Sequence, residues 1–200
     1  MNYPNTLKNL IDSFKKLPGI GEKTAERLAF SMLNFKDEDI DVFSKSIKDV
    51  KEKIKKCNIC SNLTEDDICL ICSDNNREND ILCVVEDTKG LMLFEKIGFF
   101  KGKYHILDGL ISPLNGINPE DLNIDRLLKR VEQEKIKEVI IAVKPTIEGE
   151  TTALYILKIL EGLEVVVSKL AHGVPIGADM EYLDPMTLEM AMFDRKKISE

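Results

Sequence analysis

The spacing of hydrophobic residues predicts a helical amino-terminal part followed by alternating strands and helices. Apolar residues recur at helical spacing in two early segments, Leu7–Phe14 and Ala25–Leu33, and the segment Leu17-Pro18-Gly19-Ile20-Gly21 interrupts them. A third helix is predicted by Ile40, Phe43, Ile47, Val50 and Ile54. The first 56 residues therefore form a set of helices with one tight turn.

Beyond residue 80, short β-rich runs alternate with helical ones. The predicted strands are Ile81–Val85, Tyr104–Leu107, Val139–Val143 and Val165–Val167. The predicted helices are Lys89–Ile97, Ile124–Glu134, Thr151–Leu160 and Pro185–Arg195. This alternation is typical of a mainly parallel sheet with helices on both faces. The fold class is thus α+β, with a helical region, a cysteine-rich segment, an α/β domain and a carboxyl-terminal helix.

Composition and charge argue against a membrane or secreted protein and are compatible with binding to DNA. The chain has 200 residues, 44% of them hydrophobic, and no apolar run approaches the ~20 residues that span a bilayer. The start, Met1-Asn2-Tyr3-Pro4, is not that of a signal peptide, so we expect a cytoplasmic protein. The net charge is −7, but residues 1–56 carry 12 Lys and Arg against 9 Asp and Glu. A basic segment on an acidic body suits contact with DNA at one end, and equally a solvated helix face.

The turn in the helical part resembles a helix-hairpin-helix, a unit that binds the DNA backbone. Gly19 and Gly21 carry no side chain to block a phosphate, and the next helix directs its free N–H groups at that phosphate. Lys23 and Arg27, four residues apart, project from one face beside the turn. The alternative is a plain αα-hairpin whose glycines only cap a helix. Glu22 places a negative charge beside the predicted phosphate site.

Four cysteines form the sharpest motif. Cys57 and Cys60 make one Cys-x-x-Cys knuckle, and Cys69 and Cys72 make a second after eight residues. Four thiolates at this spacing predict a structural Zn²⁺ site with no open position for catalysis. Two disulfides or an iron–sulfur cluster are the alternatives, and a cytoplasmic setting disfavours disulfides. Cys83 lies inside an apolar strand, where it is predicted to be part of the core.

The acids at two strand ends resemble those of the Toprim domain of topoisomerases, primases and some nucleases. In catalytic members, a strand ending in Glu and a later Asp-x-Asp pair hold magnesium for phosphoryl transfer. Here Glu86, Glu148 and Glu150 are present, but Lys144 and Thr146 stand at the Asp-x-Asp positions. Because magnesium prefers carboxylate ligands, we expect its chemistry to be lost. The remaining acids then form a docking surface for a basic partner, or are solvated residues at helix amino termini.

The order of motifs along the whole chain resembles the bacterial RecR family of recombination mediators. The shared features include Leu17–Gly21, the paired knuckles, Tyr104–Pro113, Glu148-Gly149-Glu150 and Ala171–Gly177. The resemblance implies a non-catalytic protein of recombinational DNA repair. Such proteins help load RecA on single-stranded DNA, act with RecO and RecF, and associate into dimers or ring-like tetramers. The family usually has Asn at the position of Lys144, and often Pro at that of Glu22.

The resemblance also implies roles for individual residues. Lys23 and Arg27, with Gly19 and Gly21, would face single- or double-stranded DNA without reading its sequence, and the four cysteines would hold zinc. Glu86 and Glu148 would meet RecO. The implied regions are a helix-hairpin-helix at 1–56, a zinc finger at 57–72, a Toprim domain at 80–175 and a helical segment at 176–200. Two hypotheses of other classes stay open: a magnesium-dependent nuclease or primase, and an acidic interaction module without DNA affinity.

Overall fold

The chain divides into two compact units in the computed structural model, Met1–Ile54 and Lys55–Glu200. The structure describes residues 3–171 and 173–197, so His172 of the Ala171–Gly177 motif lies outside it. The division falls before Lys55 because Lys55 and Lys56 form β1, which pairs with β2 of the cysteine-rich segment. These two lysines therefore belong with the second unit.

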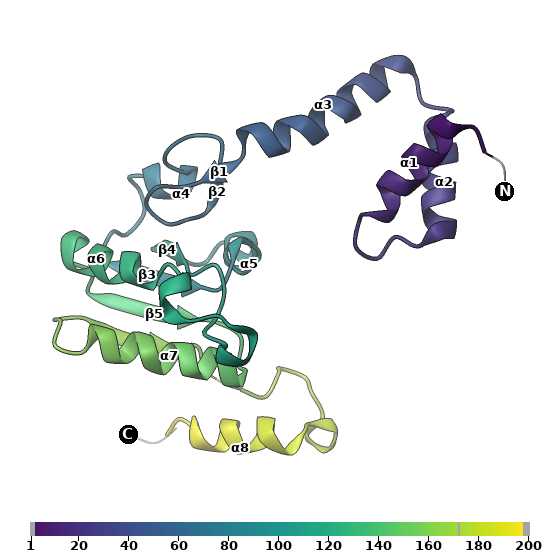
Figure 1. Ribbon diagram of the computed structural model, residues 1–200. Helices are drawn as coiled ribbons and strands as arrows, with labels where there is room; N and C mark the ends of the chain where they lie inside the picture. Colours follow the sequence, from purple (N-terminus) through teal and green to yellow (C-terminus); the bar gives the residue numbers. More distant parts are fainter. Residues whose placement is uncertain (1–2, 172, 198–200) are drawn as a thin grey trace. The chain divides into compact units, whose positions relative to one another are not determined.

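In its described residues, 3–54, the first unit consists of three helices. They are α1 (Asn5–Lys15), α2 (Glu22–Met32) and α3 (Asp37–Lys53). Figure 1 shows α1 and α2 side by side, joined by a tight turn. Small residues on α2, Ala25 and Ala29, are fully buried and let α1 approach closely enough to bury Ile11. Tyr3 and Phe30 close one end of this core with an edge-to-face ring contact at 5.6 Å.

The second unit begins with the cysteine-rich segment and continues into the α/β domain. The segment contains β1 (Lys55–Lys56), β2 (Leu63–Thr64) and α4 (Leu70–Ser73). The domain contains β3 (Ile81–Val85), α5 (Thr88–Ile97), β4 (Lys103–Ile106), α6 (Ile124–Glu134), β5 (Glu138–Ala142), α7 (Ile147–Leu160) and β6 (Val166–Lys169). Short 3₁₀ turns lie at Pro113–Asn115 and Pro119–Asp121.

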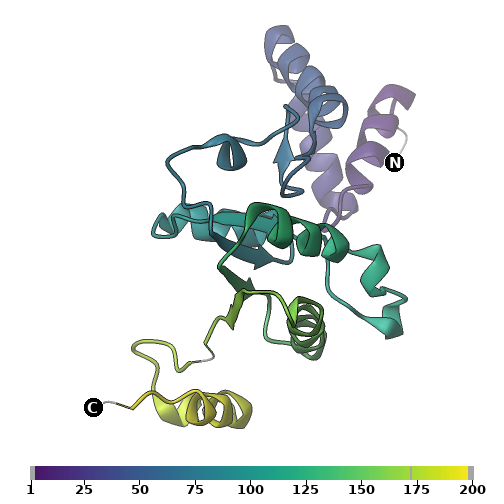
Figure 2. The same cartoon turned by 90° about the vertical axis from the view of Figure 1, so that its left-hand side faces the viewer.

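The sheet is fully parallel, in the order β4-β3-β5-β6. Alternate residues of the strands point to opposite faces, so each face builds its own core. Leu82, Val84 and Val139 pack against α6 and α7, whereas Cys83 and Val85 pack against α5. Figure 2 shows α6 and α7 on one side of the sheet and α5 on the other. The predicted parallel sheet with helices on both faces is confirmed.

Most predicted elements lie within one or two residues of those observed, but α7 begins four residues earlier than predicted. Thr146 caps this helix by accepting a hydrogen bond from the Gly149 N–H at 3.2 Å. The first turn of α7 therefore contains Glu148 and Glu150, which the sequence pattern places before the helix. At the other end of the chain, α8 (Pro185–Phe193) ends two residues before the predicted Arg195.

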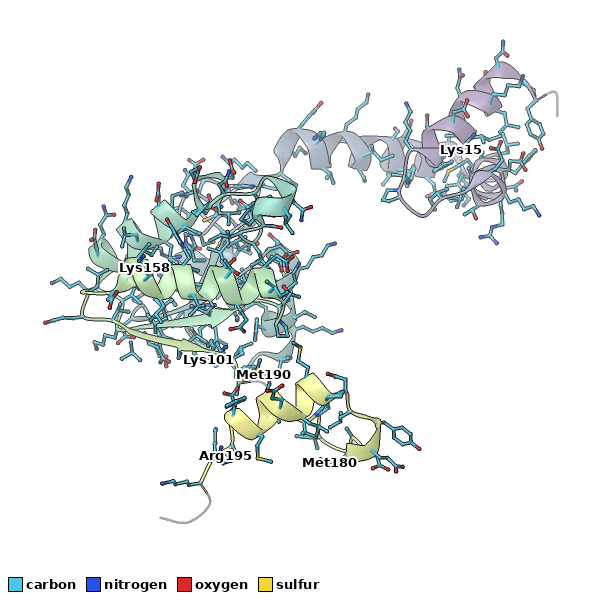
Figure 3. The ribbon with its side chains drawn as sticks, turned by 60° about the horizontal axis from the view of Figure 1, so that its bottom comes forward. Lys15, Lys101, Lys158, Met180, Met190 and Arg195 are labelled. Carbon is cyan, nitrogen blue, oxygen red and sulfur yellow. The ribbon has the colours of Figure 1, made fainter. Side chains whose placement is uncertain are left out.

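The carboxyl-terminal segment is an exposed apolar helix. Asp184 caps α8 by accepting a hydrogen bond from the Thr187 N–H at 2.9 Å, and Pro185 occupies its first turn. Met190, labelled in Figure 3, lines a groove between α7 and α8. Met192 and Phe193 stay more than half exposed. Over the described residues, none of the helices combines the length and the apolar character needed to cross a membrane.

Candidate functional site

The hairpin between α1 and α2 turns on Gly19. The Ile20 N–H donates to the Leu17 carbonyl at 3.2 Å, with Pro18 and Gly19 at the two central positions of the turn. Gly19 has a φ of 79°, a conformation that glycine adopts without strain, while Pro18 supplies the fixed φ of the preceding position. A side chain built at Gly19 or Gly21 would meet no atom within 4 Å. Both glycines therefore face open space.

The amino terminus of α2 is open to a ligand. Gly21 is the residue before the helix, and no side chain caps the first N–H groups. Lys23 and Arg27 are both exposed on this helix. Among the residues that the structure describes, neither forms an ion pair, in contrast to Lys53, Lys55 and Lys56. The turn thus presents free N–H donors beside two uncommitted cations, which is the arrangement that holds a phosphate.

Glu22 is neutralised within the hairpin. Its carboxylate lies 2.8 Å from the Lys15 ammonium, which also lies 3.5 Å from Asp12. Hydrogen bonding to Glu22 raises the pKa of Lys15 above its usual value. The negative charge beside the turn is therefore paired with the last residue of α1.

The four predicted cysteines gather at one point. All four side chains are buried, and their sulfur atoms lie within 4.8 Å of one another. The Sγ atoms of Cys60 and Cys69 are 3.5 Å apart, close to the ~3.8 Å that a tetrahedral zinc–tetrathiolate centre requires. Backbone N–H groups point at the sulfurs: Ile59 and Cys69 donate to Cys57, and Asn62 donates to Cys60. Such donors stabilise thiolate charge.

The electrostatics of these thiols fit a metal centre. The neighbouring Cys69 raises the pKa of Cys60 to about 12, whereas hydrogen bonds from Cys60 and Cys72 lower the pKa of Cys69. Four crowded thiols without a counter-charge cannot all ionise, so a dication is needed to hold them as thiolates. A buried set of four cysteines is a structural Zn²⁺ site. Cys83 lies in β3 outside this cluster, as predicted, and burial raises its pKa to about 12.

The finger is fastened to the outer edge of the sheet. The Ile106 N–H of β4 donates to the Cys60 carbonyl at 2.9 Å. Arg126 of α6 donates to the Ser61 hydroxyl at 3.0 Å and to the Asn58 carbonyl. The sequence offered no sign of this arginine's role, because it lies next to a core position of an ordinary amphipathic helix. The zinc finger therefore also covers β4, an edge strand of the sheet.

The carboxyl ends of β3 and β5 bring together the residues at the Toprim acid positions. We name this region, Glu86, Lys144, Glu148 and Glu150, the acidic edge. The Lys144 ammonium lies 2.9 Å from the Glu86 carboxylate, and this hydrogen bond raises the pKa of Lys144. Glu150 pairs in the same way with Lys169, the last residue of β6, at 2.8 Å. Two of the three acids are thus matched by cations of the same chain.

The acidic edge does not fit magnesium. Lys144 occupies the first position of the Asp-x-Asp pair and forms an ion pair with Glu86. A dication there would meet an ammonium instead of a carboxylate. Thr146, at the second position, uses its side chain to cap α7. Gly149 is required by the same fold, since a β-carbon there would lie 1.9 Å from the Lys144 carbonyl oxygen. Lys144 and Thr146 therefore both have partners within the chain, and neither supplies a carboxylate.

Comparisons with known proteins match every region of the chain. Family models match as RecR helix-hairpin-helix over residues 7–51, RecR four-cysteine zinc finger domain over 54–74, Toprim domain over 80–171 and RecR C-terminal over 173–196. Recombination protein RecR of Staphylococcus saprophyticus and that of Staphylococcus haemolyticus are each 46% identical to the chain over 198 residues. Each alignment covers 99% of this chain and all of the relative. The chain belongs to the RecR family.

Membership of the RecR family identifies the four-cysteine cluster and the domain of the parallel sheet. The four-cysteine cluster is the family's zinc finger, and its zinc is structural. The parallel sheet, with the acidic edge at its carboxyl end, is a Toprim domain. The predicted assignment to RecR and the predicted zinc are confirmed.

Proposed function

We propose that this RecR-family chain is a non-catalytic recombination mediator in DNA repair. In this proposal the hairpin holds the DNA backbone and the acidic edge docks RecO, with RecF as a further partner. The assembly helps load RecA on single-stranded DNA. Both relatives are named recombination protein RecR, and the helix-hairpin-helix match supports binding to DNA.

The observation that carries the DNA-binding part is the pair of uncommitted cations beside an open helix terminus. Lys23 and Arg27 lie one turn apart on α2, next to two glycines that leave space for a phosphate. Contacts of this kind bind the backbone of single or double strands and do not read bases. We therefore assign Gly19, Gly21, Lys23 and Arg27 to DNA.

The absence of catalysis is supported by the ion pair of Glu86 and Lys144 and by the capping role of Thr146. Docking of RecO at Glu86 and Glu148 is supported by the net acidity of residues 57–200, with 16 Lys and Arg against 26 Asp and Glu. A homo-oligomer, a dimer or ring-like tetramer, is supported by α3. Within the described residues, this helix buries none of its side chains and exposes Val42, Ile47 and Val50.

Fluorescence anisotropy of labelled DNA against salt concentration tests the proposal. We expect the Lys23→Ala/Arg27→Ala variant to lose about tenfold or more in affinity and to lower the salt slope by roughly 1 per removed contact. The matched control is Lys48→Ala/Lys51→Ala, which removes the same charge from exposed positions of α3. Equal losses of DNA affinity in the two variants would mean that only net charge matters, and the hairpin would then not be the DNA-binding site.

A second assay tests the non-catalytic part. The purified chain is incubated with Mg²⁺ and labelled DNA, and we expect no cleavage. Cleavage that Glu86→Gln abolishes would overturn the proposal in favour of a nuclease.

A further inference from the structure

Two apolar side chains beside the acidic edge are almost fully exposed. Leu114 is 99% exposed and Ile147 is 83% exposed. Isolated exposed apolar residues are common on protein surfaces. These two lie on segments that hydrogen bonds join to the turn of Glu148, within the acidic edge.

Leu114 stands at the tip of a braced loop, residues 108–123. Backbone hydrogen bonds join Ser112 and Ile117 in both directions, at 2.9 and 3.0 Å, and the Asn115 amide donates to the Ser112 hydroxyl at 2.8 Å. Gly116 closes the turn with a φ of 72°. The tip cannot fold inward without breaking this bridge.

The base of the same loop is bonded to the start of α7. The Ile111 N–H donates to the Thr152 hydroxyl at 2.9 Å, and that hydroxyl donates to the Glu148 carbonyl at 2.6 Å. Figure 1 shows the loop beside the amino-terminal end of α7. The loop that carries Leu114 and the helical turn that carries Glu148 are therefore fixed to each other.

Ile147 is the first residue of α7. The cap from Thr146 and the close packing of Gly149 against the Lys144 carbonyl fix this turn. Its side chain is thus presented to solvent at the carboxyl edge of the sheet, between Lys144 and Glu148 in the chain. Ile147 and Leu114 thus lie on two segments that are both joined to the turn that carries Glu148.

We propose that Leu114 and Ile147 are the apolar anchors of a protein-docking surface whose polar part is the acidic edge. The fitting partner is a protein with an apolar recess rimmed by Lys and Arg. After Lys144 and Lys169 pair with Glu86 and Glu150, the acidic edge keeps a net negative charge, which disfavours nucleic acid and a symmetric contact with a second copy. The inference deepens the proposed docking of RecO and rests on it.

Titration of labelled chain with purified RecO at low and at high salt tests the inference. We expect Leu114→Ser/Ile147→Ser to lower the affinity by about tenfold or more, because buried apolar anchors dominate interface energies. The factor is the same at both salt concentrations, since the lost contact is not ionic. Glu86→Gln/Glu148→Gln should give a loss that shrinks at high salt.

The matched control is Leu93→Ser/Ile97→Ser. It makes the same two substitutions at positions that are 65% and 69% exposed on α5, which covers the opposite face of the sheet. This variant should bind RecO like the wild type. Unchanged melting temperature and zinc content of both variants confirm that the fold is kept.

The outcomes are distinguishable. If Leu114→Ser/Ile147→Ser binds RecO within twofold of the wild type while the Glu variant is weakened, the anchors are wrong and the proposed docking stands. If wild type does not bind RecO, both fail. If the Ser variant instead changes the sedimentation of the chain alone, the surface is an interface between copies, which also overturns the inference.

Discussion

The zinc centre and the acidic edge are two clusters of potential metal ligands in one unit, and they resolve their charge in opposite ways. At the zinc centre, four buried thiols lie within 4.8 Å of one another, and no cation from the described part of the chain pairs with them. At the acidic edge, Lys144 and Lys169 supply ammonium groups to Glu86 and Glu150. The two clusters show that a set of potential ligands is neutralised either by a metal or by cations of the same chain, and the acidic edge uses the second.

The largest effect is expected from removing a cysteine of the zinc centre. Cys69→Ala should abolish zinc retention and unfold the segment around β1, β2 and α4, because metal binding of about 10–16 kcal/mol drives the folding of such segments. The finger also covers β4 through Ile106 and Arg126, so the melting temperature of the Toprim domain should fall as well. Zinc content by mass spectrometry and thermal unfolding measure both effects.

The control for this experiment is Cys83→Ala, at a buried cysteine of β3 outside the cluster. It should keep one zinc per chain and lose only about 1–2 kcal/mol of stability from the small cavity. Loss of zinc in this variant, or full retention in Cys69→Ala, would contradict the four-thiolate assignment.

An intermediate effect is expected from giving the acidic edge its missing carboxylates. In Lys144→Asp/Thr146→Asp, the internal cation is removed and two ligands are added, while Asp at position 146 still caps α7. We expect Mn²⁺ to stabilise this variant by about 2.7 kcal/mol at a hundredfold excess over its dissociation constant, and to leave wild type unchanged. Thermal unfolding with and without Mn²⁺ measures the difference.

The matched control removes the lysine without adding ligands. Lys144→Ala/Thr146→Ser should show no Mn²⁺ effect, since Glu86 and Glu148 alone lack the two added carboxylates. Stabilisation of wild type by Mn²⁺ would show instead that a metal ion binds at the acidic edge despite Lys144. An internal cation would then not prevent metal binding.

The sequence predicted the two clusters unequally well. The knuckle spacing Cys57-x-x-Cys60 and Cys69-x-x-Cys72 is local, so the zinc site could be derived without knowing the fold. The strands were also predictable, because strands buried on both faces of a parallel sheet read as continuous apolar runs. The apolar runs placed Ile81–Val85 without error.

The ion pairs could not be predicted in the same way. Lys144 and Glu86 are 58 residues apart and meet only because β3 and β5 are neighbours in the sheet. The pairing of Lys15 with Glu22 likewise depends on the geometry of the hairpin, and it matches the negative charge of Glu22 beside the proposed phosphate site. Arg126 carried no sequence signal at all, because its partners are a hydroxyl and a carbonyl of the finger.

The smallest effect is expected at Thr146, where substitutions test whether the hydroxyl is needed to cap α7. If this residue is kept for its cap, Thr146→Ala should cost about 1 kcal/mol, and Thr146→Ser should cost almost nothing because serine caps equally well. Chemical denaturation resolves this difference, with Thr151→Ala as the control on the exposed side of the same helix. Equal stability of all three variants would mean that the hydroxyl is not needed for α7. The presence of Thr at position 146 would then have no explanation in the capping of α7.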